Sequence, residues 1–185
     1  ITSVAGVAVS LSIQGVLSNF ASGVMQLSSK RFKEGDYIKI GAVEGTVTGI
    51  DITSITLTTP DNKIIYVPNS NSTTNELTNF TANETRRIEI LVGVKYGSDV
   101  DQVKVIVDSL FKADSRILTD PAPTCRLKEF GSSSLVFTIR CHTKTPDFWD
   151  VQFDLNEKIY AEFAKYKIEI PFNQLDVHIK SDENN

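Results

Sequence analysis

Charged residues are missing from the first 29 positions of this 185-residue chain. The charge-free stretch ends abruptly at Lys30, Arg31 and Lys33. Soluble domains rarely keep so long an N-terminal segment free of charge and then place a cluster of cations directly after it. This pattern is typical of a helix that faces a membrane and ends at the cytoplasmic surface. The missing charge therefore predicts a membrane-facing helix over residues 1–29.

Small residues are unusually frequent in this segment. They are Thr2, Ser3, Ala5, Gly6, Ala8, Ser10, Ser12, Gly15, Ser18, Ala21, Ser22 and Gly23. Small side chains let helix backbones approach one another closely, so we expect the helix to pack against copies of itself. Hydropathy alone leaves open a buried or amphipathic helix of a soluble protein, since the mean hydropathy of the whole chain is −0.10.

The start of the chain lacks an initiator methionine, a basic leader region and a signal-peptide cleavage site. A helix over residues 1–14 would rise about 21 Å at about 1.5 Å per residue, less than the thickness of a hydrocarbon core, which is about 30 Å. We therefore expect further membrane segments upstream of Ile1.

Gln14 and Gly15 mark the first interruption of this helix, because a glycine inside a helix weakens it and permits a bend. We expect a kink there that divides the helix in two. Apolar residues then recur at helical spacing in the second half, and we expect this stripe to lie along an interface. The stripe consists of Val16, Phe20, Val24 and Leu27.

Cysteine and histidine are scarce, which argues against metal and redox chemistry. Cys125 and Cys141 are not spaced as a CxxC motif, and His142 and His178 are far apart. We expect free, partly buried thiols and no metal site or cofactor. No nucleophile with a base and no pair of carboxylates stands out, so an enzyme is not predicted. The net charge of −4 and the isoelectric point near 5.2 give nucleic-acid binding no electrostatic support.

Two patterns of secondary structure follow the helix. Short alternating segments separated by glycines predict strands at residues 37–40, 45–50, 54–58 and 64–67. Such strands indicate a small SH3-like or Sm-like β-barrel over residues 30–82. Residues 83–180 predict the order strand, helix, strand, strand, helix, strand, which is a ferredoxin-like α+β domain with a closing strand at 175–179. Residues 181–185 are predicted to form a disordered tail.

An ordered series of motifs lies at residues 9–23, 31–38, 45–47, 63–69, 86–87, 93–96 and 99–103. This series resembles the bacterial small-conductance mechanosensitive channel (MscS) family. The resemblance covers nearly the whole chain, and the ordered series is more specific than any single motif. It implies a pore-lining third membrane helix, a middle barrel and a C-terminal α/β domain.

The same resemblance implies the activity and the partners. Membrane tension would open a channel that releases ions and small osmolytes during hypo-osmotic shock. The chain would assemble with itself, as a homoheptamer, in the bacterial inner membrane, with residues after about 30 in the cytoplasm. Membrane lipids and permeant solutes would be its other partners, and nucleic acid would not.

The resemblance also assigns roles to individual residues of the helix. The two hydrophobic pore rings fall on Val7 and Leu11, and the kink falls on Gln14 and Gly15. Without the resemblance, Val7 and Leu11 would be read as ordinary packing residues. For Gln14, pairing with a neighbouring copy explains the polar side chain better than a role in ion selection does.

A further pair, Asn19 and Ser70, is expected to couple the helix to the barrel. Taken alone, Asn19 is explained as well by a hydrogen bond to its own helix backbone as by a contact with the barrel.

The alternative to a channel is a soluble RNA-binding or scaffold protein that combines an Sm-like barrel with a ferredoxin-like module. The strand at 135–139 lacks the aromatic and basic pattern of an RRM, which counts against RNA binding.

Overall fold

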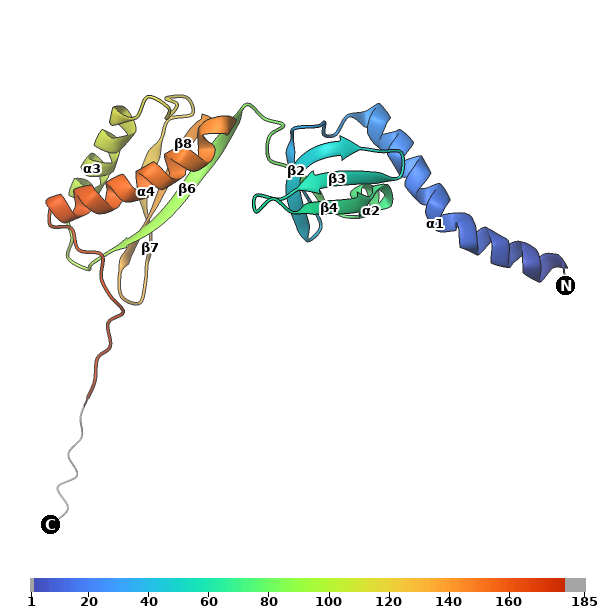
Figure 1. Cartoon of the computed structure of the whole chain (residues 1–185). Coiled ribbons are helices and arrows are strands. Elements are labelled where there is room, and N and C mark those ends of the chain that lie inside the picture. Colours follow the sequence, from blue (N-terminus) through green and yellow to red (C-terminus); the bar gives the residue numbers. More distant parts are fainter. Residues whose placement is uncertain (1, 179–185) are drawn as a thin grey trace, which may run out of the picture. The chain divides into compact units, whose positions relative to one another are not determined.

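The computed structural model describes residues 2–178, and the chain divides into two compact units (Figure 1). The first comprises Ile1–Asn83 and the second Glu84–Asn185. The fold class is confirmed: a long helix is followed by a small barrel-like sheet and then by an α+β domain.

The first unit opens with one long helix, α1, over Thr2–Ser29. It ends where Lys30 adopts a positive φ of 48° and donates its backbone N–H to the carbonyl of Gln26. The helix continues without interruption through Gly15. Figure 1 shows its axis changing direction near the middle of the helix. The assignment of that bend to Gln14 and Gly15 stays a prediction.

Five antiparallel strands form the sheet of the first unit, in the order β4-β3-β2-β1-β5. They are β1 (Tyr37–Ile40), β2 (Val43–Ile50), β3 (Ser54–Thr58), β4 (Ile64–Pro68) and β5 (Leu77–Asn79). A short helix, α2 (Asn69–Thr74), connects β4 to β5. The inward residues form one apolar core of Phe32, Ile38, Ile40, Val47, Ile55, Leu57 and Val67. The four predicted strands are confirmed, whereas α2 and β5 were not predicted.

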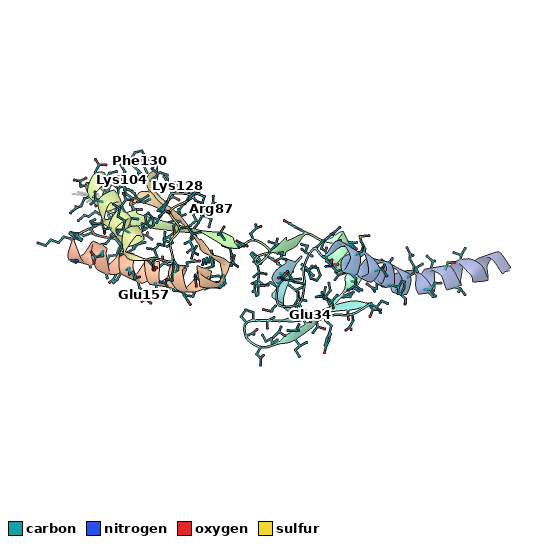
Figure 2. All side chains as sticks on the ribbon, turned by 90° about the horizontal axis from the view of Figure 1, so that it is seen from above. Glu34, Arg87, Lys104, Lys128, Phe130 and Glu157 are labelled. Atoms are coloured by element: carbon teal, nitrogen blue, oxygen red, sulfur yellow. The ribbon has the colours of Figure 1, made fainter. Side chains whose placement is uncertain are left out.

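The second unit is a three-stranded antiparallel sheet with two helices packed on one face. The strands are β6 (Thr85–Val94), β7 (Thr124–Phe130) and β8 (Leu135–Lys144), in the order β6-β8-β7. The helices are α3 (Val100–Ala113) and α4 (Phe148–Lys165), the latter preceded by a 3-10 turn, η1 (Thr145–Asp147). The predicted inward residues of α4, from Val151 to Phe163, belong to the same core as Val103, Val107 and Phe137. Figure 2 shows Lys104 on α3 and Glu157 on α4.

The predicted closing strand is not part of this sheet. Residues 175–178 form no strand within the described chain, and Ile179 and the tail 181–185 lie outside the described residues. The predicted closing strand is therefore not formed in the single chain, and its pairing with copies of the chain stays a prediction. Leu175 and Val177 alternate with polar residues as expected of a strand, but their side chains are 84% and 69% exposed. A segment with this pattern needs a neighbouring strand before it can pair, and it pairs with none among residues 2–178.

An ion-pair network joins the end of α3 to α4. Asp114, whose side chain is only 9% exposed, accepts from Nε and Nη2 of Arg116 at 2.9 and 2.7 Å and from Nζ of Lys158 at 3.2 Å. Arg116 also donates to Asp154 at 2.5 Å. The hydrogen bonds from Arg116 hold the pKa of the Asp114 carboxyl well below its usual range.

We predict that Asp114→Asn lowers the free energy of unfolding at pH 7 by about 1–3 kcal/mol, because it leaves two cations without their shared carboxylate. A folded-state pKa below the unfolded value means that the carboxylate stabilises the fold above about pH 4 and loses this effect as the pH falls further. Urea unfolding at pH 7 and pH 3 should therefore show a difference between wild type and variant that shrinks at pH 3. The more exposed Asp154→Asn is the control, and an equal loss in both variants would contradict the prediction.

Candidate functional site: helix α1 and its seat on the barrel

Helix α1 exposes most of its large apolar side chains. In the described part of the chain these exposed residues are Val7, Val9, Leu11, Ile13, Val16, Leu17, Phe20, Val24, Met25 and Leu27. Figure 2 shows the side chains along the N-terminal half of α1 standing clear of the rest of this unit. A continuous apolar surface of this kind marks a site that other protein or lipid covers. The helix is therefore the candidate functional element of the first unit.

Val7 and Leu11 lie on one face of α1, because they are four residues apart. Their side chains are 60% and 66% exposed. The helical rise separates them by about 6 Å along the axis. If several copies surrounded one axis with this face inward, the two residues would form two stacked apolar rings. Their role as pore rings stays a prediction.

Gln14 and Gly15 are exposed in the middle of the helix. A Cβ atom added to Gly15 would have no neighbour within 4 Å. Packing within this chain therefore does not require the glycine, and its role in a kink stays a prediction.

The structure brings Asn19 and Ser70 together. The backbone N–H of Ser70 donates to Oδ1 of Asn19 at 3.0 Å. Ser70 is in the first turn of α2, and Pro68 at the N-cap of that helix makes no side-chain cap bond. The first N–H groups of a helix have no partner within it, so Asn19 satisfies one of them from another helix. The bond is observed, and its role in coupling stays a prediction.

The apolar stripe of Val16, Phe20, Val24 and Leu27 does not contact the barrel, because all four residues are exposed in the single chain. Its place along an interface stays a prediction. Ser22, Gly23 and Gln26, on the adjoining face of the helix, are buried against the barrel instead. The hydroxyls of Ser22 and Thr73 are 3.1 Å apart and share a hydrogen bond. The helical spacing of Asn19, Ser22 and Gln26 was the signal in the sequence, but it is a polar one.

The cysteines and histidines are the other candidate site residues that the sequence offers. Within the described residues, no group of three or more potential ligands is placed to hold a metal ion. Cys125 and Cys141 are free and buried, as predicted, and burial raises the pKa of each thiol to about 11. Thiols that stay protonated at neutral pH are poor nucleophiles and poor metal ligands.

In the part of the chain that the structure describes, none of the helices combines the length and the apolar character that a membrane crossing needs.

Comparison with known proteins gives a consistent picture. A family model described as the mechanosensitive ion channel beta-domain matches residues 15–82, and one described as mechanosensitive ion channel MscS, C-terminal, matches residues 88–170. A small-conductance mechanosensitive channel from Edwardsiella ictaluri is 43% identical over 95% of this chain and 61% of its own length. One from Helicobacter pylori is 36% identical over 96% of this chain and 65% of its own length. The chain thus spans less than two thirds of these curated relatives.

The solved structures agree with the sequence relatives. The crystal structure of Helicobacter pylori MscS in a closed state matches with a TM-score of 0.92 and 33% identity, over 98% of this chain and 72% of that one. These homologues and this fold are those of a channel rather than an enzyme, and they give the soluble RNA-binding or scaffold alternative no support. The chain belongs to the MscS family of mechanosensitive ion channels.

Proposed function

We propose that this chain forms the pore helix and the cytoplasmic domains of a channel that membrane tension opens, releasing ions and small osmolytes during hypo-osmotic shock. The observation that carries the proposal is α1: a charge-free helix with an exposed apolar surface, attached to two domains of the channel family. Residues 1–29 serve as the pore helix and residues 30–82 as the barrel. Residues 83–180 serve as the α/β domain with its C-terminal strand, and the predicted tail 181–185 lies outside the described residues.

Self-assembly into a ring, a heptamer in this proposal, follows from surfaces that the single chain leaves uncovered. The apolar side chains of α1 need partners, and the alternating segment at 175–178 needs a neighbouring strand. The sheet of the first unit adds an open edge at β4, where Ile64 and Tyr66 are exposed. Copies of the chain around one axis would cover all three surfaces.

Placement in the bacterial inner membrane follows from the family and from the charge pattern. The cluster of Lys30, Arg31 and Lys33 directly after α1 favours a cytoplasmic position for the residues that follow. Lipids would then contact the outside of the ring, and ions and small solutes would be its permeants. The net charge of −4 makes nucleic acid an unsuitable partner.

The mechanism that we propose rests on the two apolar rings of Val7 and Leu11. A narrow apolar constriction loses its water, and a dry constriction stops ions without a plug. Tilting of the helices about Gln14 and Gly15 widens the rings until water enters. Tension favours the wide state because that state occupies more membrane area.

The direct test is patch-clamp recording of the full-length protein in liposomes, together with survival of hypo-osmotic shock in bacteria that lack other tension-gated channels. We expect pressure-dependent currents and restored survival. A full-length protein that stays in the membrane but passes no current at any tension below patch rupture would contradict the proposal.

A further prediction concerns the hydrogen bond between Asn19 and Ser70. Asn19→Leu removes the acceptor, and a net hydrogen bond contributes about 1 kcal/mol in each subunit, so a concerted transition feels the sum. We expect altered closing or inactivation under sustained tension and almost unchanged single-channel conductance.

The structure supplies two controls for this variant. Asn19→Asp keeps the acceptor, and Ser70→Ala keeps the donor because the donor is the backbone N–H. Both should behave like wild type in the same patch protocol. A change of conductance with intact inactivation in Asn19→Leu would place Asn19 in the permeation path and refute the coupling role.

A further inference from the structure

Gly23 lies where α1 packs closely against the barrel. A Cβ atom added at this position would lie 2.3 Å from the carbonyl oxygen of Ile52 and 2.6 Å from Nδ2 of Asn69. Real Cβ atoms do not approach other atoms so closely, and the nearer atom belongs to the backbone. A residue with a side chain at position 23 therefore forces α1 away from its seat. Gly6 and Gly15 differ, because a Cβ atom at either would meet nothing within 4 Å.

The surface that receives Gly23 has little freedom to give way. Asn69 is fully buried, its Nδ2 donates to the carbonyl of Asp51 at 2.9 Å, and its backbone N–H donates to the carbonyl of Thr53 at 3.0 Å. The hydroxyl of Ser72 donates to the carbonyl of Asn69 at 2.8 Å. Asn69 thus fastens the loop between β2 and β3 to α2. An added methyl group would displace α1 rather than this loop.

The sequence around Gly23 admits only one register of α1 on the barrel. The contacting stripe repeats at intervals of three or four residues, as Asn19, Ser22 and Gln26. A polar stripe of this kind would allow α1 to shift along the barrel by one helical turn, because its hydrogen-bonding groups would meet new partners there. Such a slide would bring residue 19 or 20, or residue 26 or 27, against the Ile52 carbonyl. All four carry a Cβ atom, so the slide is blocked.

We propose that Gly23 is a positioning residue that locks the C-terminal half of α1 onto the barrel in a single register, so that these two parts move as one body. A movement of the N-terminal half is then taken up before Asn19, where Gly15 has open space around it. This consequence for gating rests on the proposed channel function. The lock itself does not, since it is a property of the contact within one chain.

The yield of a disulfide between Ser22→Cys and Thr73→Cys measures the contact between α1 and the barrel directly, because the two hydroxyl oxygens are 3.1 Å apart in the wild type. It is measured on the full-length protein in membranes under mild oxidation. The buried Cys125 and Cys141 compete little, since they stay protonated. We expect Gly23→Ala to lower the disulfide yield several-fold and Gly15→Ala to leave it unchanged. Both substitutions raise helix propensity equally, so only the contact distinguishes them.

A second pair tests the register without changing Gly23. Gln26→Cys with Thr73→Cys closes a disulfide only if α1 slides by about one turn. A yield near background supports the lock, and a yield comparable to that of the Ser22→Cys pair overturns it. Equal yields of the Ser22→Cys pair in the Gly23→Ala and Gly15→Ala backgrounds overturn it as well. Patch recordings of the same proteins judge the channel function separately, because cross-linking requires no current.

Gln26 offers a variant with the opposite expected effect. It is 3% exposed, and among the described residues its Nε2 has no hydrogen-bond partner. An unpaired buried donor weakens the contact, and an apolar side chain of similar size does not have this penalty. Gln26→Leu should therefore raise the yield of the Ser22→Cys and Thr73→Cys disulfide. A lower yield would show that this amide has a partner in the assembled protein and that the seat differs from the one proposed.

Discussion

Full-length channels that carry Leu11→Ser are expected to open at lower membrane tension than the wild type and to slow the growth of cells that express them. Leu11 is 66% exposed in the single chain and shares a helix face with Val7. In the proposed ring, its copies form a dry collar. Burying a leucine side chain contributes about 1.5–3 kcal/mol, so the substitution removes that much from the closed state in each subunit. A serine hydroxyl also holds water in the constriction and lowers the dewetting barrier.

The tension threshold relative to an internal reference channel is the measurement. Leu17→Ser is the matched control, because Leu17 is 63% exposed on the same helix but lies on a different face from Val7 and Leu11. We expect a lowered threshold for Leu11→Ser and a near-normal one for Leu17→Ser. An unchanged threshold for Leu11→Ser would remove Val7 and Leu11 from the gate.

The elements with strong periodic patterns could be predicted from the sequence. Strands β1 to β4 alternate apolar and polar residues, and both helices of the second unit carry an inward apolar face. Helix α2 was missed because its sequence, NSNSTT, contains no apolar residue and is held by tertiary hydrogen bonds. Strand β5 has three residues, too few for a period of two to show.

The seat of α1 on the barrel was harder to predict, because the usual rule for amphipathic helices is reversed there. The rule expects the apolar stripe of a helix to face its own domain. Here the polar and small residues Ser22, Gly23 and Gln26 face the barrel, while Phe20 and Val24 are exposed. This reversal is physically sensible if other copies or lipid cover the apolar side. One chain cannot show that side buried.

The candidate site shows the same division between local and assembled structure. The Asn19 to Ser70 contact was predicted from the family motif, and its geometry requires only one chain. The close approach at Gly23 was missed, since a glycine among many small residues gives no signal until the Ile52 carbonyl is placed beside it. Val7 and Leu11 acquire a role only through symmetry between copies, which no single chain contains.

Residues 175–178 lead to the last prediction, that removing residues from Leu175 onward makes the ring dissociate at lower temperature. Leu175 and Val177 are 84% and 69% exposed, and pairing with the same segment of neighbouring copies would bury both. At about 1.5–3 kcal/mol for each buried side chain, the loss is about 3–6 kcal/mol per subunit.

Apolar and polar residues alternate along 175–178, so the two faces of the expected strand can be changed separately as controls. Replacing Leu175 and Val177 by serine should act like the deletion, because it removes the apolar face while keeping the backbone. Replacing Asp176 and His178 by serine should have little effect, since these residues belong to the opposite face of the same strand. Thermal dissociation of the oligomer in mild detergent, followed by size-exclusion chromatography, separates the three. A truncated protein with the heat stability of the wild-type ring would show that the terminal segment does not hold the copies together, and assembly would then rest on α1 and the β4 edge.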